Sequence, residues 1–132
     1  MAENSIPFQI IDWNNVETTE HKGEQGSAFW NTVQFPGLRI RIVTYSAGYL
    51  ADHWCKKGHI VHCLEGELIT EHESGESYLL RAGMTYVVSD NLSSHRSLAE
   101  GEVKLLIIDG DFLKETDESV TGIEISGVNI HD

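Results

Sequence analysis

The sequence predicts an all-β fold of short antiparallel strands, arranged as a sandwich or a barrel. Apolar and polar residues alternate with a period of two along most of the chain, as expected for strands that bury one face. Turn-forming pairs such as Pro36-Gly37 and Ala82-Gly83 separate these runs at short intervals. Only the segments 13–20 and 112–118 could hold a helical turn, so short helical turns are expected at the ends alone.

The strands are expected in a regular order along the chain. The clearest is Leu38–Tyr45, which reads LRIRIVTY and alternates throughout. Glu65-Gly66 should close a hairpin between the two strands on either side of it. The remaining strands are predicted at Phe8–Trp13, Phe29–Phe35, Ile60–Leu64, Glu67–His72, Tyr78–Leu80, Thr85–Ser89 and Val103–Asp109.

The 132 residues are expected to form one domain, because a chain of this length buries enough surface to fold as a single unit without disulfides. Its core is expected at about 28–109, with an edge strand over 7–13 and an acidic tail over 110–132. Phe8 and Ile10 give that edge strand an apolar face, which pairing in a homodimer would cover.

Charge and composition exclude several partners. The chain has 9 Lys and Arg against 21 Asp and Glu, a net charge of −12, so nucleic acid and anionic membranes are not expected to bind it. No run approaches the roughly 20 apolar residues of a membrane span, and the amino terminus lacks the pattern of a secretory signal. Two cysteines without an export signal predict free thiols in the cytoplasm.

Histidine and cysteine gather in one short region of the chain. His53 and Cys55 are two residues apart and would share a face of a strand, and His59 follows a turn at Lys57-Gly58. If all three point inward, two imidazoles and a thiol meet at one place, where zinc, iron, nickel or copper could bind. The alternative is a buried apolar cysteine with unrelated histidines. The histidines outside this inward set are expected at the exterior or the surface: His21, His62, His72 and His131.

Two stretches of the sequence resemble the cupin family of small jelly-roll β-barrels. The residues from Gly48 to Gly66, GYLADHWCKKGHIVHCLEG, follow the first cupin motif, usually written with two histidines and a glutamate. The residues from Gly83 to His95, GMTYVVSDNLSSH, keep the order of the second motif. The Asp52–Cys55 run, followed by Lys-Gly-His, resembles a narrower subgroup called the DHCW-motif cupins, which has a fold but no settled reaction.

The resemblance implies a single antiparallel jelly-roll barrel and one divalent transition metal inside it. Carried over position by position, the ligands would be His53, Cys55, His59 and His95, with Cys55 replacing a histidine and His59 the glutamate. These exchanges favour Zn, Fe or Ni over Mn or Mg. Three histidines and a cysteine could form a closed zinc site, or three histidines alone could leave positions open; a cupin without metal is the remaining alternative.

Further residues are expected around this site from strand parity. Asp52 is a candidate to accept the N–H of a ligating imidazole. Arg39 and Arg41 share one face of their strand; inward they would attract a carboxylate, but the solvated outward orientation is favoured. The candidate pocket residues are Tyr45, Tyr49, Trp54, Cys63, Tyr86 and Arg96.

Two classes of function remain open on the sequence. One is a metalloenzyme, oxygenase- or isomerase-like, acting on a small polar molecule; the other is a non-catalytic module that binds a small molecule or a metal. If the protein is an enzyme, its chemistry should depend on the metal and not on a free nucleophile. The sequence offers neither a pair of inward carboxylates nor a glycine-rich phosphate loop.

Overall fold

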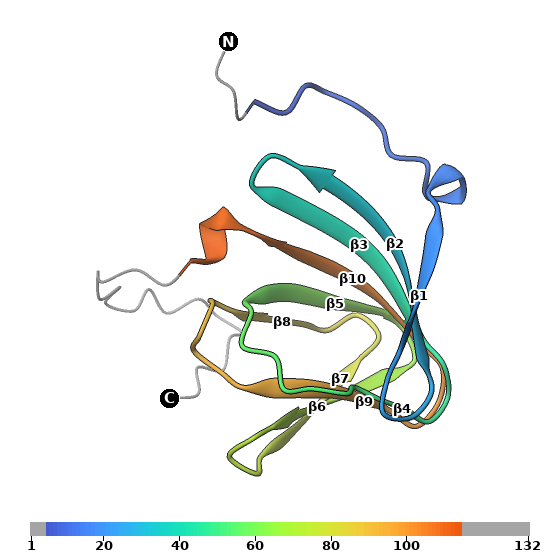
Figure 1. Cartoon of the computed structure of the whole chain (residues 1–132), viewed down its shortest axis with the longest axis vertical. Helices are drawn as coiled ribbons and strands as arrows, with labels where there is room; N and C mark the ends of the chain where they lie inside the picture. The colour runs from blue at the N-terminus through green and yellow to red at the C-terminus, as the bar shows by residue number, and fades with distance from the viewer. Residues whose placement is uncertain (1–4, 115–132) are drawn as a thin grey trace.

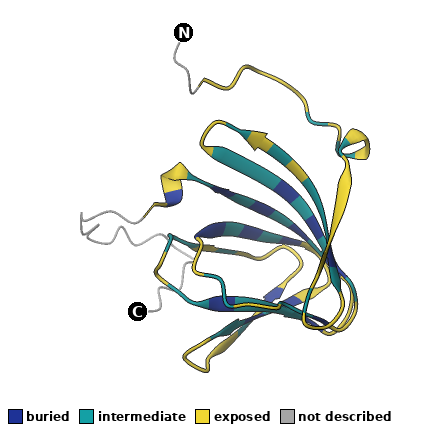
Figure 2. Ribbon diagram, viewed as in Figure 1, coloured by how far each residue is buried: buried dark blue, intermediate teal, exposed yellow. Residues whose placement is uncertain are grey.

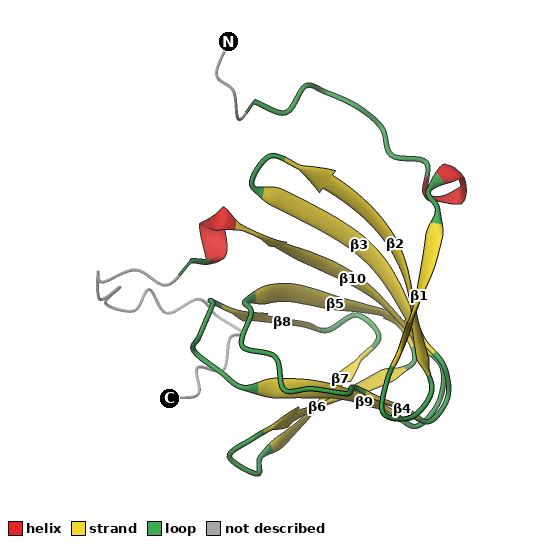
Figure 3. Cartoon of the chain, viewed as in Figure 1, coloured by secondary structure: helices red, strands yellow, loops and turns green. Residues whose placement is uncertain are grey.

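The computed structural model describes residues 5–114, and most of them lie in β-strands (Figures 1 and 3). Two 3-10 turns, η1 (Trp13–Asn15) and η2 (Asp111–Leu113), flank the strands, so the expectation of helical turns only near the ends is met within this range. The strands are β1 (Thr18–Lys22), β2 (Ser27–Phe35), β3 (Leu38–Tyr45), β4 (Tyr49–Leu50), β5 (His59–Glu65), β6 (Glu67–His72), β7 (Ser77–Arg81), β8 (Thr85–Val88), β9 (His95–Ala99) and β10 (Val103–Gly110).

The strands form two antiparallel sheets, which confirms the predicted fold class. The larger sheet has the order β1-β2-β3-β10-β5-β8, and the smaller has the order β4-β9-β6-β7. Figure 1 shows the two sheets approaching each other where β4 and β9 run beneath β3 and β10. The sheets face one another as in a jelly roll without closing into a continuous barrel. No helix among residues 5–114 has the length and apolar character needed to cross a membrane.

The core lies between the inner faces of the two sheets (Figure 2). In β10, Val103, Leu105 and Ile107 alternate inward and are buried, as the period of two predicts. The smaller sheet contributes Leu68, which is fully buried, so both sheets cover apolar area that would otherwise meet water. Tyr45 and Tyr49 stack with their ring centroids 4.3 Å apart at one end of this core.

The inner face of β3 differs from the expectation for its arginines. Arg41 is buried with 4% exposure and Arg39 is half-buried, although an outward, solvated orientation was favoured. The reason is a carboxylate on the neighbouring strand: the register pairs Asp109 of β10 with Arg39, and Asp109 is also buried. Buried guanidinium groups need such a partner, and the pairing could not be predicted because the two strands are far apart in the sequence.

The segment Phe8–Trp13 is not a strand, contrary to the prediction. It pairs with no strand among residues 5–114, and Phe8 and Ile10 are 93% and 85% exposed. The Asp12 side chain accepts a hydrogen bond from the Asn14 backbone N–H and starts η1 instead. One edge of the larger sheet is β1, which overlaps the end of the segment 13–20 expected to hold a helical turn. The strands β1, β4 and β9 were not predicted. Residues 115–132 of the acidic tail, with His131, lie outside the described range.

Candidate metal centre

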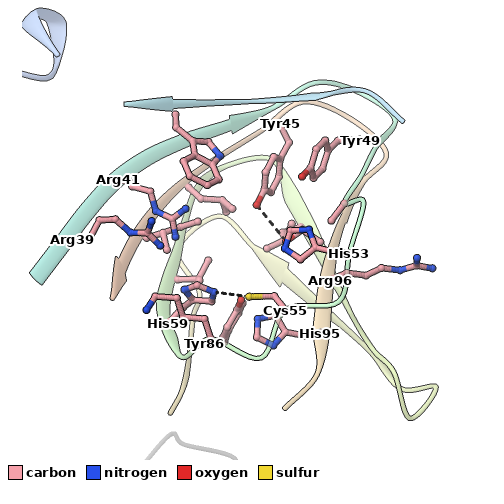
Figure 4. A pocket seen from close by; sticks show the side chains of 18 residues that line it. Arg39, Arg41, Tyr45, Tyr49, His53, Cys55, His59, Tyr86, His95 and Arg96 are labelled. Carbon is pink, nitrogen blue, oxygen red and sulfur yellow. Dashed lines mark hydrogen bonds between the residues drawn. The ribbon is translucent and has the colours of Figure 1, made fainter. Parts of the chain in front are cut away.

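Three potential metal ligands converge in the interior: Cys55, His59 and His95. Their donor atoms all lie within 4.8 Å of one another (Figure 4). His59 begins β5 and His95 begins β9, one in each sheet. Cys55 lies in the segment between β4 and β5 and is held by backbone hydrogen bonds of 2.7 and 2.9 Å to His95. The β-bridge between Cys55 and His95 therefore fixes the thiol beside both imidazoles.

Each imidazole is oriented through its Nδ1 atom. His59 Nδ1 lies 3.3 Å from Asp109 Oδ2, and His95 Nδ1 lies 2.8 Å from Ser93 Oγ. The other nitrogen of each ring, Nε2, faces the centre. His59 Nε2 lies 3.7 Å from Cys55 Sγ, and His95 Nε2 is buried without a hydrogen-bond partner among residues 5–114. An imidazole held at one nitrogen by a carboxylate or hydroxyl, with the other nitrogen free, is the arrangement found around metal ions. The donors present thus fit a metal.

The charges at the centre favour the metal-binding form of Cys55 but not that of His59. The imidazoles of His59 and His95 lower the pKa of Cys55 to about 5, so the sulfur is a thiolate at neutral pH. Burial lowers the pKa of His59, but Asp109 and Cys55 outweigh burial, and the pKa of His59 is raised. Thiolate is the form that metals bind, and a metal would replace the proton on the imidazole.

Asp109 connects this centre to the arginines of β3, and sequence reasoning missed it. Its carboxylate accepts hydrogen bonds from Arg39 Nε (3.0 Å) and Nη2 (2.9 Å), and from Arg41 Nη2 (3.0 Å). Burial raises the pKa of Asp109, but bonds from His59 and Arg39 and the charge of Arg41 hold that pKa well below its usual range. A signal was present: the inward residues of β10 continue from Val103 to Asp109, which places a carboxylate on a buried face.

The centre opens onto a cavity of about 260 Å³. Its walls combine the three donors with Arg41 and the aromatic ring of Tyr86 (Figure 4). Apolar side chains from both sheets complete the lining: Val61, Leu68, Leu105 and Ile107. Concave sites with mostly apolar walls and a few convergent polar groups are typical of small-molecule binding.

Comparison with known proteins identifies the architecture. No family model matches the sequence, and no curated protein matches it. Among solved structures, ectoine synthase from P. lautus is similar with a TM-score of 0.64 and 19% identity, covering 78% of each chain. A sugar phosphate isomerase of the cupin superfamily from Silicibacter pomeroyi has a TM-score of 0.62 and 12% identity, covering 78% of this chain and 76% of that one. The chain has the cupin fold.

A third similar structure holds a metal. It is the iron protein Fe(II)-HppE with the alternative substrate (S)-1-HPP, with a TM-score of 0.65 and 16% identity, covering 77% of this chain and 60% of that chain. Cupin neighbours of this chain thus include an Fe(II) protein and proteins named for small-molecule chemistry.

His53 occupies the first histidine position of the cupin motif, but the structure does not bring it into the group of three donors. Its side chain is 72% exposed, and its Nδ1 lies 2.7 Å from Asp52 Oδ1, which is exposed as well. His53 and Cys55 do not lie on one strand as predicted: Asp52 and His53 form a bend, and Cys55 makes an isolated bridge. The carboxylate that contacts a donor imidazole is therefore Asp109, where Asp52 was expected.

The predicted pocket residues divide into two groups. Tyr45, Tyr49 and Tyr86 line the cavity, and burial raises the pKa of all three hydroxyls, so they are neutral. Cys63 is fully buried in the core and outside the cavity, because its place on β5 points it at the Glu65–Gly66 turn, whose carbonyls its thiol contacts.

Arg96 lines the cavity, whereas Trp54 is not part of the lining. The Arg96 guanidinium group lies 2.8 Å from a Glu71 carboxylate oxygen and stacks on the Trp54 ring at 4.4 Å. Both contacts direct the charge of Arg96 away from the other labelled side chains in Figure 4. Trp54 thus serves as a platform for this arginine.

Proposed function

We propose that this cupin binds one divalent transition metal, Zn, Fe or Ni, through Cys55, His59 and His95. The observation that carries the proposal is the buried Nε2 atom of His95, which has no hydrogen-bond partner in the described part of the chain and faces a thiolate and a second imidazole. A buried nitrogen lone pair or N–H without a partner is costly, and a metal ion would satisfy it. The Asp52–Cys55 run also supports placing the protein with the DHCW-motif cupins.

The function we propose is the binding or conversion of a small polar molecule in the cavity. Three protein donors on a cavity wall are typical of sites that keep a coordination position open, whereas structural zinc sites use four. When bound, the metal would supply Lewis-acid or redox chemistry to that molecule. The chain's own groups would position the ligand and the metal: Tyr45 and Tyr86 form part of the cavity wall against which the ligand would pack, and Asp109 orients the His59 ring toward the metal.

Metal content tests the proposal. We expect about one metal ion per chain in protein purified without added metal, measured by elemental analysis, and a thiolate-to-metal absorption band after cobalt(II) replacement. Cys55→Ser should abolish that band, and His59→Ala or His95→Ala should weaken metal binding by more than about tenfold.

His62→Ala is the matched control, because His62 lies on the other face of β5 and its Nδ1 bonds to Thr85. His53→Ala tests the fourth residue of the motif: loss of metal in that variant would make His53 a ligand. Metal binding that survives substitution of Cys55, His59 and His95 in folded protein would refute the proposed centre.

A second candidate function is covalent chemistry at Cys55. The observation favouring it is the chain of contacts from Cys55 Sγ to His59 Nε2 (3.7 Å) and from His59 Nδ1 to Asp109 (3.3 Å), the order of a nucleophile, a base and an orienting group. Any turnover that persists in protein shown to be metal-free, and disappears in Cys55→Ser, would favour this candidate over the metal centre.

We also propose that the protein is a cytoplasmic homodimer. The free thiols of Cys55 and Cys63 support the location. The exposed apolar side chains of Phe8 and Ile10 support the dimer, because a second copy would remove them from water.

Sedimentation at tens of micromolar is expected to give about twice the chain mass of 14.8 kDa. Phe8→Ser with Ile10→Ser should shift the protein to monomer, whereas Leu92→Ser, at another exposed apolar residue, should not. A monomeric wild-type protein would contradict the proposal.

A further inference from the structure

The cavity beside Cys55, His59 and His95 has a charge opposite to that of the whole protein. The chain carries −12, yet 4 of its 9 lysine and arginine residues line this cavity. They are Arg39, Arg41, Lys57 and Arg96. No aspartate or glutamate is among the lining residues in the range 5–114. Such a local concentration of positive charge in an acidic protein attracts anions to one place.

The positive charge of the inner wall is only partly neutralised. Arg39 and Arg41 share the single carboxylate of Asp109, which also contacts His59. Within the Arg39–Arg41–Asp109 group, two guanidinium groups against one carboxylate leave an excess of one positive charge, and Arg41 is buried. The Cys55 thiolate lies outside this group, beside the His59 imidazole. An unmatched buried charge is unfavourable, and a bound anion would balance it.

Arg41 also has a free donor. Its Nη2 bonds to Asp109, but its Nε–H is buried and has no hydrogen-bond partner among the described residues. The guanidinium carbon Cζ lies 4.5 Å from the centre of the Trp30 ring, and this contact orients the guanidinium group. In Figure 4, Arg41 extends from β3 toward the middle of the pocket. The donor is therefore already in place and oriented before any ligand binds.

The other two cations contribute differently. Lys57 is exposed at the cavity and makes no ion pair with any residue in the described range, so its ammonium is available to a ligand entering from solvent. Arg96 is already paired with Glu71 and contributes little net charge. The remaining walls are largely apolar and aromatic, so a fully hydrated inorganic ion would leave them poorly matched.

We propose that the ligand of this cavity is a small organic carboxylate, whose carboxylate accepts from Arg41 and whose apolar part packs against the walls near the Cys55–His59–His95 centre. This inference rests on the proposed function in taking the cavity as the binding site. Planar guanidinium donors match carboxylate geometry, and hydrogen bonds between charged partners are stronger than neutral ones.

Ligand-observed NMR at pH 7.5 tests the inference with butyrate, its neutral isostere butyramide, and inorganic phosphate. We expect wild-type protein to bind butyrate at least about tenfold more tightly than butyramide, and more tightly than phosphate. Arg41→Gln should bring the ratio of butyrate to butyramide affinity close to one. Lys22→Gln, which removes a charge from exposed β1, should leave it unchanged.

Lys57→Gln is a second variant that tests the inference if Arg41→Gln does not fold, because Lys57 is exposed and its replacement should not disturb the core. We expect Lys57→Gln to weaken butyrate binding about two- to fivefold. Equal affinities for butyrate and butyramide, or tighter binding of phosphate, would overturn the inference. The measurements use both metal-free and zinc-loaded protein. A preference for butyrate in protein that takes up no metal would support the inference while refuting the metal centre.

Discussion

Asp109→Asn is expected to lower the free energy of unfolding by about 3–5 kcal/mol, the range for removing one partner of a buried ion pair. The Asp109 side chain is 2% exposed and is the common partner of Arg39, Arg41 and His59. Asparagine keeps the shape but not the charge, so the cost is that of leaving buried guanidinium groups without a counter-ion. Urea unfolding followed by tryptophan fluorescence measures it.

The effect should depend on pH with a definite sign. Because the pKa of Asp109 is lower in the folded than in the unfolded state, its stabilising contribution is complete above pH 4 to 5 and is lost as the pH falls further. The difference between wild type and Asp109→Asn should therefore shrink in acid. Asp111→Asn is the control, because Asp111 is exposed and its one ion pair among residues 5–114 is with Lys114. The unfolding midpoint of this variant should hardly differ from that of the wild type. Equal stability of Asp109→Asn and wild type at pH 7 would contradict the assigned role.

Cys55 of metal-free protein is expected to react with iodoacetamide at a rate that hardly changes between pH 6.5 and 8.5. A pKa of about 5 makes the thiol ionised throughout this range, whereas an ordinary cysteine gains roughly 50-fold in thiolate over the same interval. Because a thiolate of low pKa is also a weaker nucleophile, the distinguishing quantity is the flat pH profile and not a high rate.

His59→Gln should restore a steeply rising profile, since His59 is the largest cause of the low pKa of Cys55. Mass spectrometry locates the modification, and Cys63 serves as an internal control: it is buried, its pKa is raised by burial, and it should stay unmodified in folded protein. Bound metal should protect Cys55. A wild-type rate that rises more than about tenfold across this range would contradict the assignment.

The sequence was sufficient for features set by local alternation. Strands such as Leu38–Tyr45 and Glu67–His72 begin and end where the period of two predicts, since the residues of their buried faces alternate with less buried ones along the sequence. The resemblance of the motifs around Cys55, His59 and His95 pointed to the cupin fold. The convergence of those three residues could be predicted because the cupin motifs relate positions that are distant in the chain, which periodicity alone does not.

The sequence was insufficient where the answer depended on a partner far along the chain. The inward orientation of Arg41 requires Asp109, which is 68 residues away, and no local pattern reveals that pair. The displacement of His53 follows from a bend at Asp52 and His53 that parity along a strand does not describe. The Phe8–Trp13 segment alternates like a strand, but alternation cannot supply the neighbouring strand that a sheet requires.

The position of β10 has a consequence for how the chain assembles during synthesis. β10 is the last described strand to be made, yet it lies between β3 and β5 in the larger sheet, with Ile107 facing Arg41 on one side and Val61 on the other. Until it emerges, β3 and β5 each present an unpaired edge, which is a template for aggregation. A nascent chain that stops before Val103 thus has two open half-sheets, and the strand that joins them also brings the counter-ion of the arginines.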